Sequence, residues 1–146
     1  IIGIGMASLL TAAMSGTRSN DAGKKIAQAV FLAQEVREWT LGLPFTDPDP
    51  ADQGNPPGPD GSDPQVFVDD LDDLMGVTYS PPRDGAGLVI YDLPDWSQAI
   101  NLSWVSPADL CSPAGPGTTD VAVVSVTVSY KGKAVLTTSW LATRKP

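Results

Sequence analysis

Histidine is absent from the 146-residue sequence, and cysteine occurs once, at Cys111. Without histidine, one chain cannot build Ser-His-Asp or Cys-His catalysis, and the side chain that most often binds metals is missing. A single cysteine forms neither an internal disulfide nor a thiolate cluster. The sequence also contains no phosphate-binding glycine loop and no Gly-x-Ser-x-Gly turn. We therefore expect no enzymatic activity.

Basic residues are scarce: nine lysines and arginines stand against 17 aspartates and glutamates, for a net charge of −8. Nucleic acid is not an expected partner, because phosphate binding requires a basic surface. The charge is also unevenly spread, since residues 46–110 hold thirteen aspartates and one basic residue, Arg83, while both ends of the chain are mildly basic. This pattern indicates either a soluble acidic face or self-association by charge complementarity at low salt.

The N-terminal segment carries no charge from Ile1 to Met14. This apolar run is shorter than the roughly 20 residues that a membrane-spanning helix needs, and it lacks the basic region of a complete signal peptide. Two interpretations stay open. The segment is a buried or interfacial helix, or it is the outer part of a longer apolar helix that starts before Ile1.

The following residues have helical periodicity, and no proline interrupts the chain before Pro44. A helix from residue 1 to about 43 would be about 65 Å long at 1.5 Å per residue, longer than one small domain is wide. We expect residues 1–23 to project as an apolar assembly or membrane helix, because an apolar rod is unstable in water. Residues 24–43 should cover a sheet with the apolar positions Ile26, Ala29, Val30, Leu32, Ala33, Val36, Trp39 and Leu43.

The rest of the chain predicts a loop at residues 44–64, rich in proline, glycine and aspartate, and a β-rich body at residues 65–146. Alternating apolar residues predict strands at residues 65–68, 77–80, 88–93, 99–105, 121–130 and 134–142. Residues 131–133 predict a tight turn, and residues 112–120 a loop. The expected fold class is α+β, with a long N-terminal helix packed on a small antiparallel sheet of about four strands in a domain of residues 24–146. The four tryptophans are expected in the core.

An acidic run, DDLDDLMG, begins at Asp69. Its aspartates are weak candidates for a calcium site, together with loop acids such as Asp60 or Asp63. However, the run lacks the spacing and the closing glutamate of a calcium-binding EF-hand loop. The simpler interpretation is a helical turn with Leu71 and Leu74 inward and all four aspartates outward, some capping free N–H groups. The candidate ligands are Asp69, Asp70, Asp72 and Asp73.

The order of these pieces resembles the type IV pilin and type II secretion pseudopilin family, in its minor-pseudopilin, prepilin-type branch. Residues 7–48 resemble the second half of the family's N-terminal helix, with a LAQ-x-x-x-E element at residues 32–38 and a Leu-Pro-Phe exit at residues 43–45. Residues 67–87 and 96–110 resemble the matching body segments, and residues 126–144 the terminal hairpin. Two features of the family are missing: the aromatic start with one glutamate, and a disulfide-bounded C-terminal loop.

The resemblance implies a structural subunit that waits in the inner membrane and then polymerises with copies of itself into an extracellular, cell-surface filament. The core of such a filament is a bundle of N-terminal helices. The alternative function is a calcium- or glycan-binding surface module that carries an anchor helix; apart from possible calcium, no cofactor is expected. For the filament, the predicted assembly interface consists of Ile1, Ile2, Ile4, Met6, Leu9, Leu10 and Met14.

Overall fold

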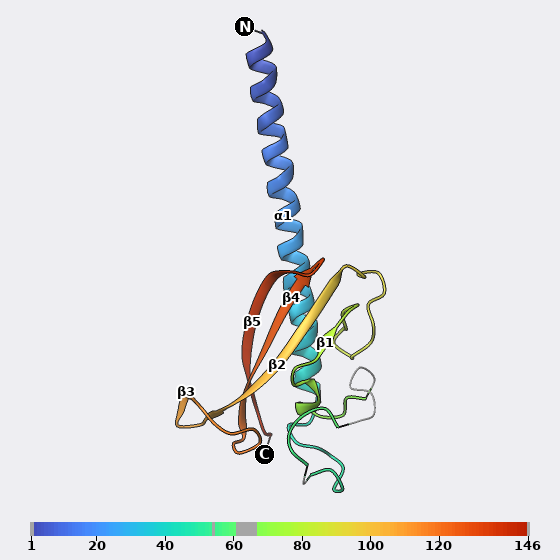
Figure 1. Ribbon diagram of the computed structural model, residues 1–146, viewed down its shortest axis with the longest axis vertical. Helices are drawn as coiled ribbons and strands as arrows, with labels where there is room; N and C mark the ends of the chain where they lie inside the picture. Colours follow the sequence, from blue (N-terminus) through green and yellow to red (C-terminus); the bar gives the residue numbers. More distant parts are fainter. Residues whose placement is uncertain (1, 54, 61–66, 146) are drawn as a thin grey trace.

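The computed structural model describes residues 2–53, 55–60 and 67–145, with side chains of the first helix described from Met14 onward. A single helix, α1 (Ile2–Gly42, 41 residues), leads the chain and extends far beyond the rest of the molecule (Figure 1). The helix ends just before Pro44, which disfavours helical geometry in the residue before it. The predicted end at about residue 43 is therefore confirmed within one residue.

One antiparallel sheet of five strands packs against the second half of α1 (Figure 1). The strand order is β1-β2-β4-β5, and β3 pairs with the end of β2. This arrangement confirms the α+β class and the helix-on-sheet packing, with one strand more than expected. The strands are β1 (Thr78–Tyr79), β2 (Trp96–Ser106), β3 (Asp109–Pro113), β4 (Val121–Tyr130) and β5 (Lys133–Thr143).

The core lies between α1 and the sheet. Strand β4 alternates as predicted, and its four inward side chains are fully buried, because successive residues of a strand face opposite sides of the sheet. Of the tryptophans, Trp39, Trp96 and Trp104 are buried and Trp140 is half-buried, which confirms their predicted place. The inward residues of α1 are Ala29, Leu32, Ala33, Val36 and Trp39.

The predicted apolar stripe of α1 was wrong at two positions. Ile26 and Val30 are 54% and 43% exposed, because the helix turns the face centred on Leu32 and Val36 toward the sheet. Residues three and four apart share a helical face, so the predicted helical periodicity was correct. Packing against the sheet determined which face of the helix is buried. The outer face of α1 consequently keeps apolar side chains without cover from the described residues.

The predicted strand at residues 88–93 was wrong. This segment is a loop with one isolated bridge, between Arg83 and Val89. The Asp84 carboxylate accepts the backbone N–H groups of Ala86 and Leu88, both at 2.9 Å, and such local bonds compete with a strand ladder. Leu88 and Tyr91 are 65% and 78% exposed, whereas Ile90 and Leu93 are partly buried against the core without belonging to a strand.

Strand β3 was missed, because residues 112–120 were predicted as a loop and its residues are mostly exposed, without alternation. Cys111 lies on this strand as an exposed free thiol. The weakly predicted strand at residues 65–68 is wrong for Phe67 and Val68, which are not in a strand, while residues 65 and 66 lie outside the described residues. Of the strand predicted at residues 77–80, the structure forms only the two residues of β1.

Candidate functional site

The first half of α1 stands clear of the body. Every described side chain from residue 14 to residue 27 is exposed, and Ala29 is the first fully buried one. The ammonium group of Lys25 lies 4.9 Å from the centre of the Tyr130 ring at the end of β4. At 1.5 Å per residue, the helical stretch before Lys25 is about 35 Å long and projects beyond the sheet. Met14, predicted in the assembly interface, is 51% exposed. The other predicted interface residues are not placed: Ile1 lies outside the described residues, and no side chain between residues 2 and 13 is described.

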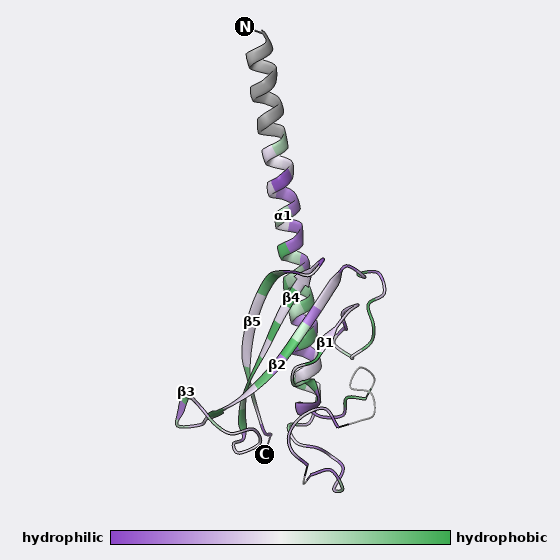
Figure 2. Cartoon of the chain, viewed as in Figure 1, coloured by the Kyte–Doolittle hydropathy of each residue, from purple (hydrophilic) through white to green (hydrophobic). Residues whose placement is uncertain are grey.

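The part of α1 that projects from the body, which we call the rod, changes in hydropathy along its described length (Figure 2). A hydrophilic band that contains Arg18, Asp21, Lys24 and Lys25 separates Met14 from the body. Below this band, α1 presents apolar side chains to solvent: Phe31 and Leu41 are 48% and 55% exposed, in addition to Ile26 and Val30. In the described part of the chain, no helix combines the length and apolar character needed to cross a membrane.

The acidic run forms a short 3-10 turn, η1 (Asp72–Leu74), at the lower end of the body. Leu71 and Leu74 are 3% and 0% exposed, so their predicted inward position is confirmed. The outward position of all four aspartates was wrong, because Asp70 and Asp73 are 4% and 1% exposed. Burial of these two carboxylates is possible because backbone N–H groups surround them.

Asp73 connects the turn to the preceding loop. Its Oδ2 accepts the N–H of Asp69 at 2.9 Å and of Asp70 at 3.4 Å, and its Oδ1 accepts the N–H of Asp60 at 3.2 Å. Asp70 caps η1 in turn, because its Oδ1 accepts the N–H groups of Asp72 and Asp73 at 2.9 and 3.2 Å. The prediction that some of these aspartates cap free N–H groups is thus confirmed for Asp70 and Asp73, which stabilise the turn.

Burial and crowding raise the pKa values of several carboxyl groups around η1. Burial, together with a hydrogen bond to Asp72 and the charge of that residue, raises the pKa of Asp70 to about 8. Burial and the nearby charges of Asp73 and Asp47 raise the pKa of Asp60 to about 6, and burial and Asp73 raise the pKa of Asp69. Like charges held together disfavour ionisation of each other, so this end of the molecule favours a positively charged partner.

An open pocket of about 390 Å³ lies beside η1. We call it the acidic pocket and define it by six of its lining residues: Asp47, Asp52, Asp60, Asp72, Trp104 and Arg144. They come from the loop after α1, from η1, from β2 and from the segment after β5. The sequence indicated an acidic middle of the chain, but it gave no signal that Trp104 and Arg144 would meet these acids.

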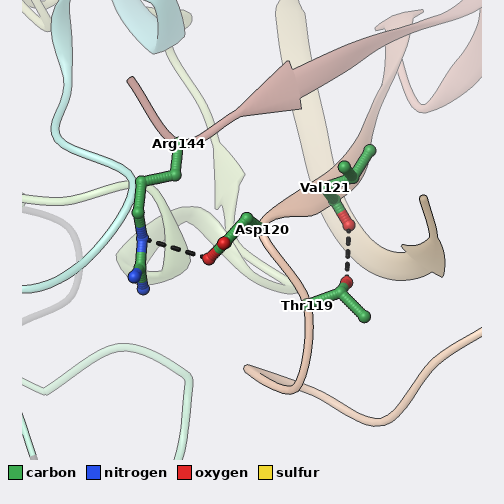
Figure 3. A network of polar contacts seen from close by, with 4 residues as sticks. All are labelled: Thr119, Asp120, Val121 and Arg144. Carbon is green, nitrogen blue, oxygen red and sulfur yellow. Dashed lines mark hydrogen bonds and ion pairs between the residues drawn. The ribbon is translucent and has the colours of Figure 1, made fainter. Parts of the chain in front are cut away.

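Arg144 is the only basic side chain among the described residues that line the acidic pocket. Its Nε lies 3.2 Å from Oδ1 of Asp120 (Figure 3). The backbone N–H of Arg144 also donates to the carbonyl of Asp120. Beside this pair, the hydroxyl of Thr119 donates to the carbonyls of Val121 and Val105. Arg144 is thus engaged at the rim, and the four carboxylates keep an excess of negative charge.

Two carboxylate groupings are close enough to share a cation: Asp47, Asp52 and Asp60, and Asp60, Asp69 and Asp73. The second fits poorly, because Asp73 already accepts three backbone N–H groups. The first brings three acids of the acidic pocket together, whereas calcium takes six to eight oxygens. Among the predicted ligands, Asp70 and Asp72 belong to neither grouping, and Asp63 lies outside the described residues.

A buried glutamine was not anticipated from the sequence. Gln98 is fully buried on β2; its amide donates to the carbonyls of Leu32 and Arg83 at 2.9 and 3.0 Å, and its Oε1 accepts the N–H of Arg83 at 2.7 Å. It therefore joins α1, β2 and the loop after β1. Only its position in the alternation of β2 marked it as inward.

Comparison with known proteins adds no relative: no protein-family model, no curated protein and no solved structure matches the chain.

Proposed function

We propose that the chain is a structural, non-catalytic subunit of a helical filament of the type IV pilus or pseudopilus kind, and that it polymerises through its N-terminal helix. One observation carries the proposal. A 41-residue helix packs on the sheet only with its second half, and the described residues before Gln28 contribute nothing to the core. A helix that served only the body would end where the sheet ends.

The physical argument concerns apolar surface. The first charged residue of the chain is Arg18, so the outer turns of the rod offer only uncharged side chains to their surroundings. Burial of several hundred Å² of such surface against neighbouring rods stabilises each contact by several kcal/mol, at roughly 25 cal/mol per Å², before the cost of association. In a bundle of such rods with the sheets outside, every copy buries its apolar surface in the same way.

The asymmetry of the molecule favours a filament over a closed dimer. The rod emerges at one end of the body, and the acidic loops lie at the other end (Figure 1). Identical copies that associate head to tail, without closing a ring, form an open helical array. The proposal includes a location in an extracellular, cell-surface filament and a stage in the inner membrane before assembly.

The test uses the full chain, released from detergent by dilution and followed by light scattering and electron microscopy. We expect filaments with the helices along the axis. Leu10→Asp places a charge in the proposed bundle and should abolish them. Asn101→Asp, which places the same charge on an exposed position of β2, should not. A monodisperse, soluble monomer of the unaltered chain would contradict the proposal.

A further inference from the structure

Four lysines gather where the rod leaves the body. Lys24 and Lys25 belong to α1, and Lys131 and Lys133 flank the turn between β4 and β5; all four are exposed. The ammonium groups of Lys25 and Lys131 lie 4.9 and 5.5 Å from the centre of the same ring, that of Tyr130. We call these four residues the lysine collar.

The lysine collar keeps a positive charge after its local partners are considered. Lys131 lies 3.5 Å from the Asp95 carboxylate, and both side chains are more than half exposed, so this ion pair is weak. Asp21 is the nearest acid along α1. Four ammonium groups thus face two carboxylates at this end of the body.

The lysine collar and the acidic pocket lie at opposite ends of the body (Figure 1). The turn between β4 and β5 is beside the emerging rod, whereas the loop after α1 and η1 form the far end. A second copy displaced along the long axis therefore brings a basic end of one molecule toward the acidic end of another. Complementary charges in such an arrangement set the register and select against wrong pairings.

The acidic pocket contains two buried polar atoms of opposite kind that have no partner among the described residues: Oδ1 of Asp60 and Nε1 of Trp104. The Trp104 side chain is 5% exposed, so its indole N–H is far removed from bulk solvent. One atom accepts hydrogen bonds and the other donates them. Both atoms are closed to solvent and belong to the walls of the pocket, so the partly exposed carboxylates of Asp47, Asp52 and Asp72 are the groups that a ligand meets.

The chemistry of the acidic pocket selects among ligand classes. A calcium ion would neutralise the carboxylates but takes six to eight oxygen ligands, and the grouping of Asp47, Asp52 and Asp60 brings together three acids. A neutral sugar offers both hydrogen-bond types but leaves the charge uncompensated, and an anion is repelled. A lysine-rich peptide turn supplies ammonium donors for the carboxylates and matches their charge.

We propose that the acidic pocket of one copy binds the lysine collar of a second copy, with the Lys131–Gly132–Lys133 turn entering the pocket. Gly132 and Lys131 have positive φ values of 75° and 49°, which hold the turn as a narrow exposed tip. The contact rests on the proposed filament and adds to it an interface between bodies, outside the helical bundle. It joins unlike surfaces, so it propagates along the axis.

The experiment uses charge reversal in the full chain. The first variant combines Lys131→Glu and Lys133→Glu, so that both ends are acidic; the second combines Asp47→Lys and Asp52→Lys, so that both ends are basic. We expect each variant alone to raise the critical concentration for assembly by at least about tenfold. An equal mixture of the two, and a chain that carries all four substitutions, should assemble close to the unaltered level.

A matched control adds acidic charge elsewhere, with Asn101→Glu and Ser139→Glu on exposed positions near the middle of β2 and β5. It should leave the critical concentration within about twofold, because charges beyond a Debye length of the contact are screened. Carbodiimide cross-linking of the unaltered chain provides a measurement that does not depend on folding of the variants. It should join Lys131 or Lys133 of one copy to Asp47, Asp52 or Asp60 of another.

The outcomes separate this inference from the proposed function. Filaments that form equally well from every variant, or cross-links that join the lysine collar only to other acids, overturn the inference and leave the filament standing. If the unaltered chain forms no filament, both proposals fail. Assembly that is lost in each variant and restored in the mixture supports the contact specifically, since a folding defect would persist in the mixture.

Discussion

Replacement of Asp70 by asparagine should stabilise the protein at neutral pH. The group is 4% exposed, and burial with the Asp72 contact raises its pKa from 3.8 to about 8. The folded protein therefore holds a proton that the unfolded chain releases. The contribution of Asp70 to stability is fully present below pH 3.8, is lost as the pH rises from there toward 8 and is constant above that value.

The magnitude follows from linkage. Between pH 6 and pH 8, one extra proton bound by the folded state costs about 2 kcal/mol of stability, which lowers the melting temperature by about 4–8 °C in a domain of this size. The Asp60 carboxyl, with a pKa of about 6, adds to the slope mainly below this interval. Asp70→Asn removes the titration and keeps an Oδ1 that accepts the N–H groups of Asp72 and Asp73.

Asp70→Ala is the matched variant. It also removes the titration, but it leaves two N–H groups of η1 without their acceptor, at about 1–3 kcal/mol for each buried group. Melting temperatures measured every half pH unit from 4 to 9 should place Asp70→Asn above the unaltered protein at pH 7.5 and level with it at pH 4. A lower melting temperature for Asp70→Asn at pH 7.5, or parallel curves for the two proteins, would refute the reasoning.

Two further predictions concern packing between α1 and the loop after β1. Gln98→Leu removes three hydrogen bonds at a fully buried position, so urea denaturation should show a loss of about 2–4 kcal/mol. Gly87→Ala should cost about 1–3 kcal/mol and alter the near-ultraviolet signal of tryptophan, because φ is 78° and a Cβ would lie 2.9 Å from the Trp39 ring.

Each of these variants has a control in the same chain. Gln53→Leu changes an exposed glutamine and should leave stability within about 0.5 kcal/mol. Gly132→Ala has a similar positive φ but open space around the added Cβ, so it isolates the backbone cost from the clash with tryptophan. Equal losses for Gly87→Ala and Gly132→Ala would contradict the packing argument, and equal losses for the two glutamine variants would contradict the buried hydrogen-bond argument.

The acidic pocket and the lysine collar give the uneven charge of the sequence a spatial meaning. The aspartates of residues 46–110 do not form one uniform face, since Asp70 and Asp73 are buried in η1 while Asp47 and Asp52 line the pocket. Arg83 is held within the loop after β1, where it donates to the carbonyl of Gly87 at 3.0 Å. Arg144 lines the acidic pocket but is paired with Asp120, so the four carboxylates of the pocket keep an excess of negative charge.

The sequence by itself determined the features that depend on local periodicity. An uninterrupted run of helix-compatible residues up to Pro44, with the fixed rise of a helix, specified a rod longer than the body. The alternation of β4 and β5 specified a half-buried hairpin. Exposed segments such as β3 gave no pattern, and residues 88–93 gave a misleading one, because Asp84 binds the backbone locally and the segment is held as a loop.

Only the tertiary structure decided which polar groups are buried and which meet. Asp69, Asp70, Asp72 and Asp73 are equivalent in the sequence, yet Asp73 is buried because the N–H of Asp60, 13 residues away, joins the local N–H groups of Asp69 and Asp70 around its carboxylate. The acidic pocket joins residues up to about a hundred positions apart, which no local pattern encodes. The periodicity of apolar side chains shows which residues of one helix or strand share a face. Contacts between distant segments depend on how the helix docks on the sheet, and the packing of the whole core determines that docking.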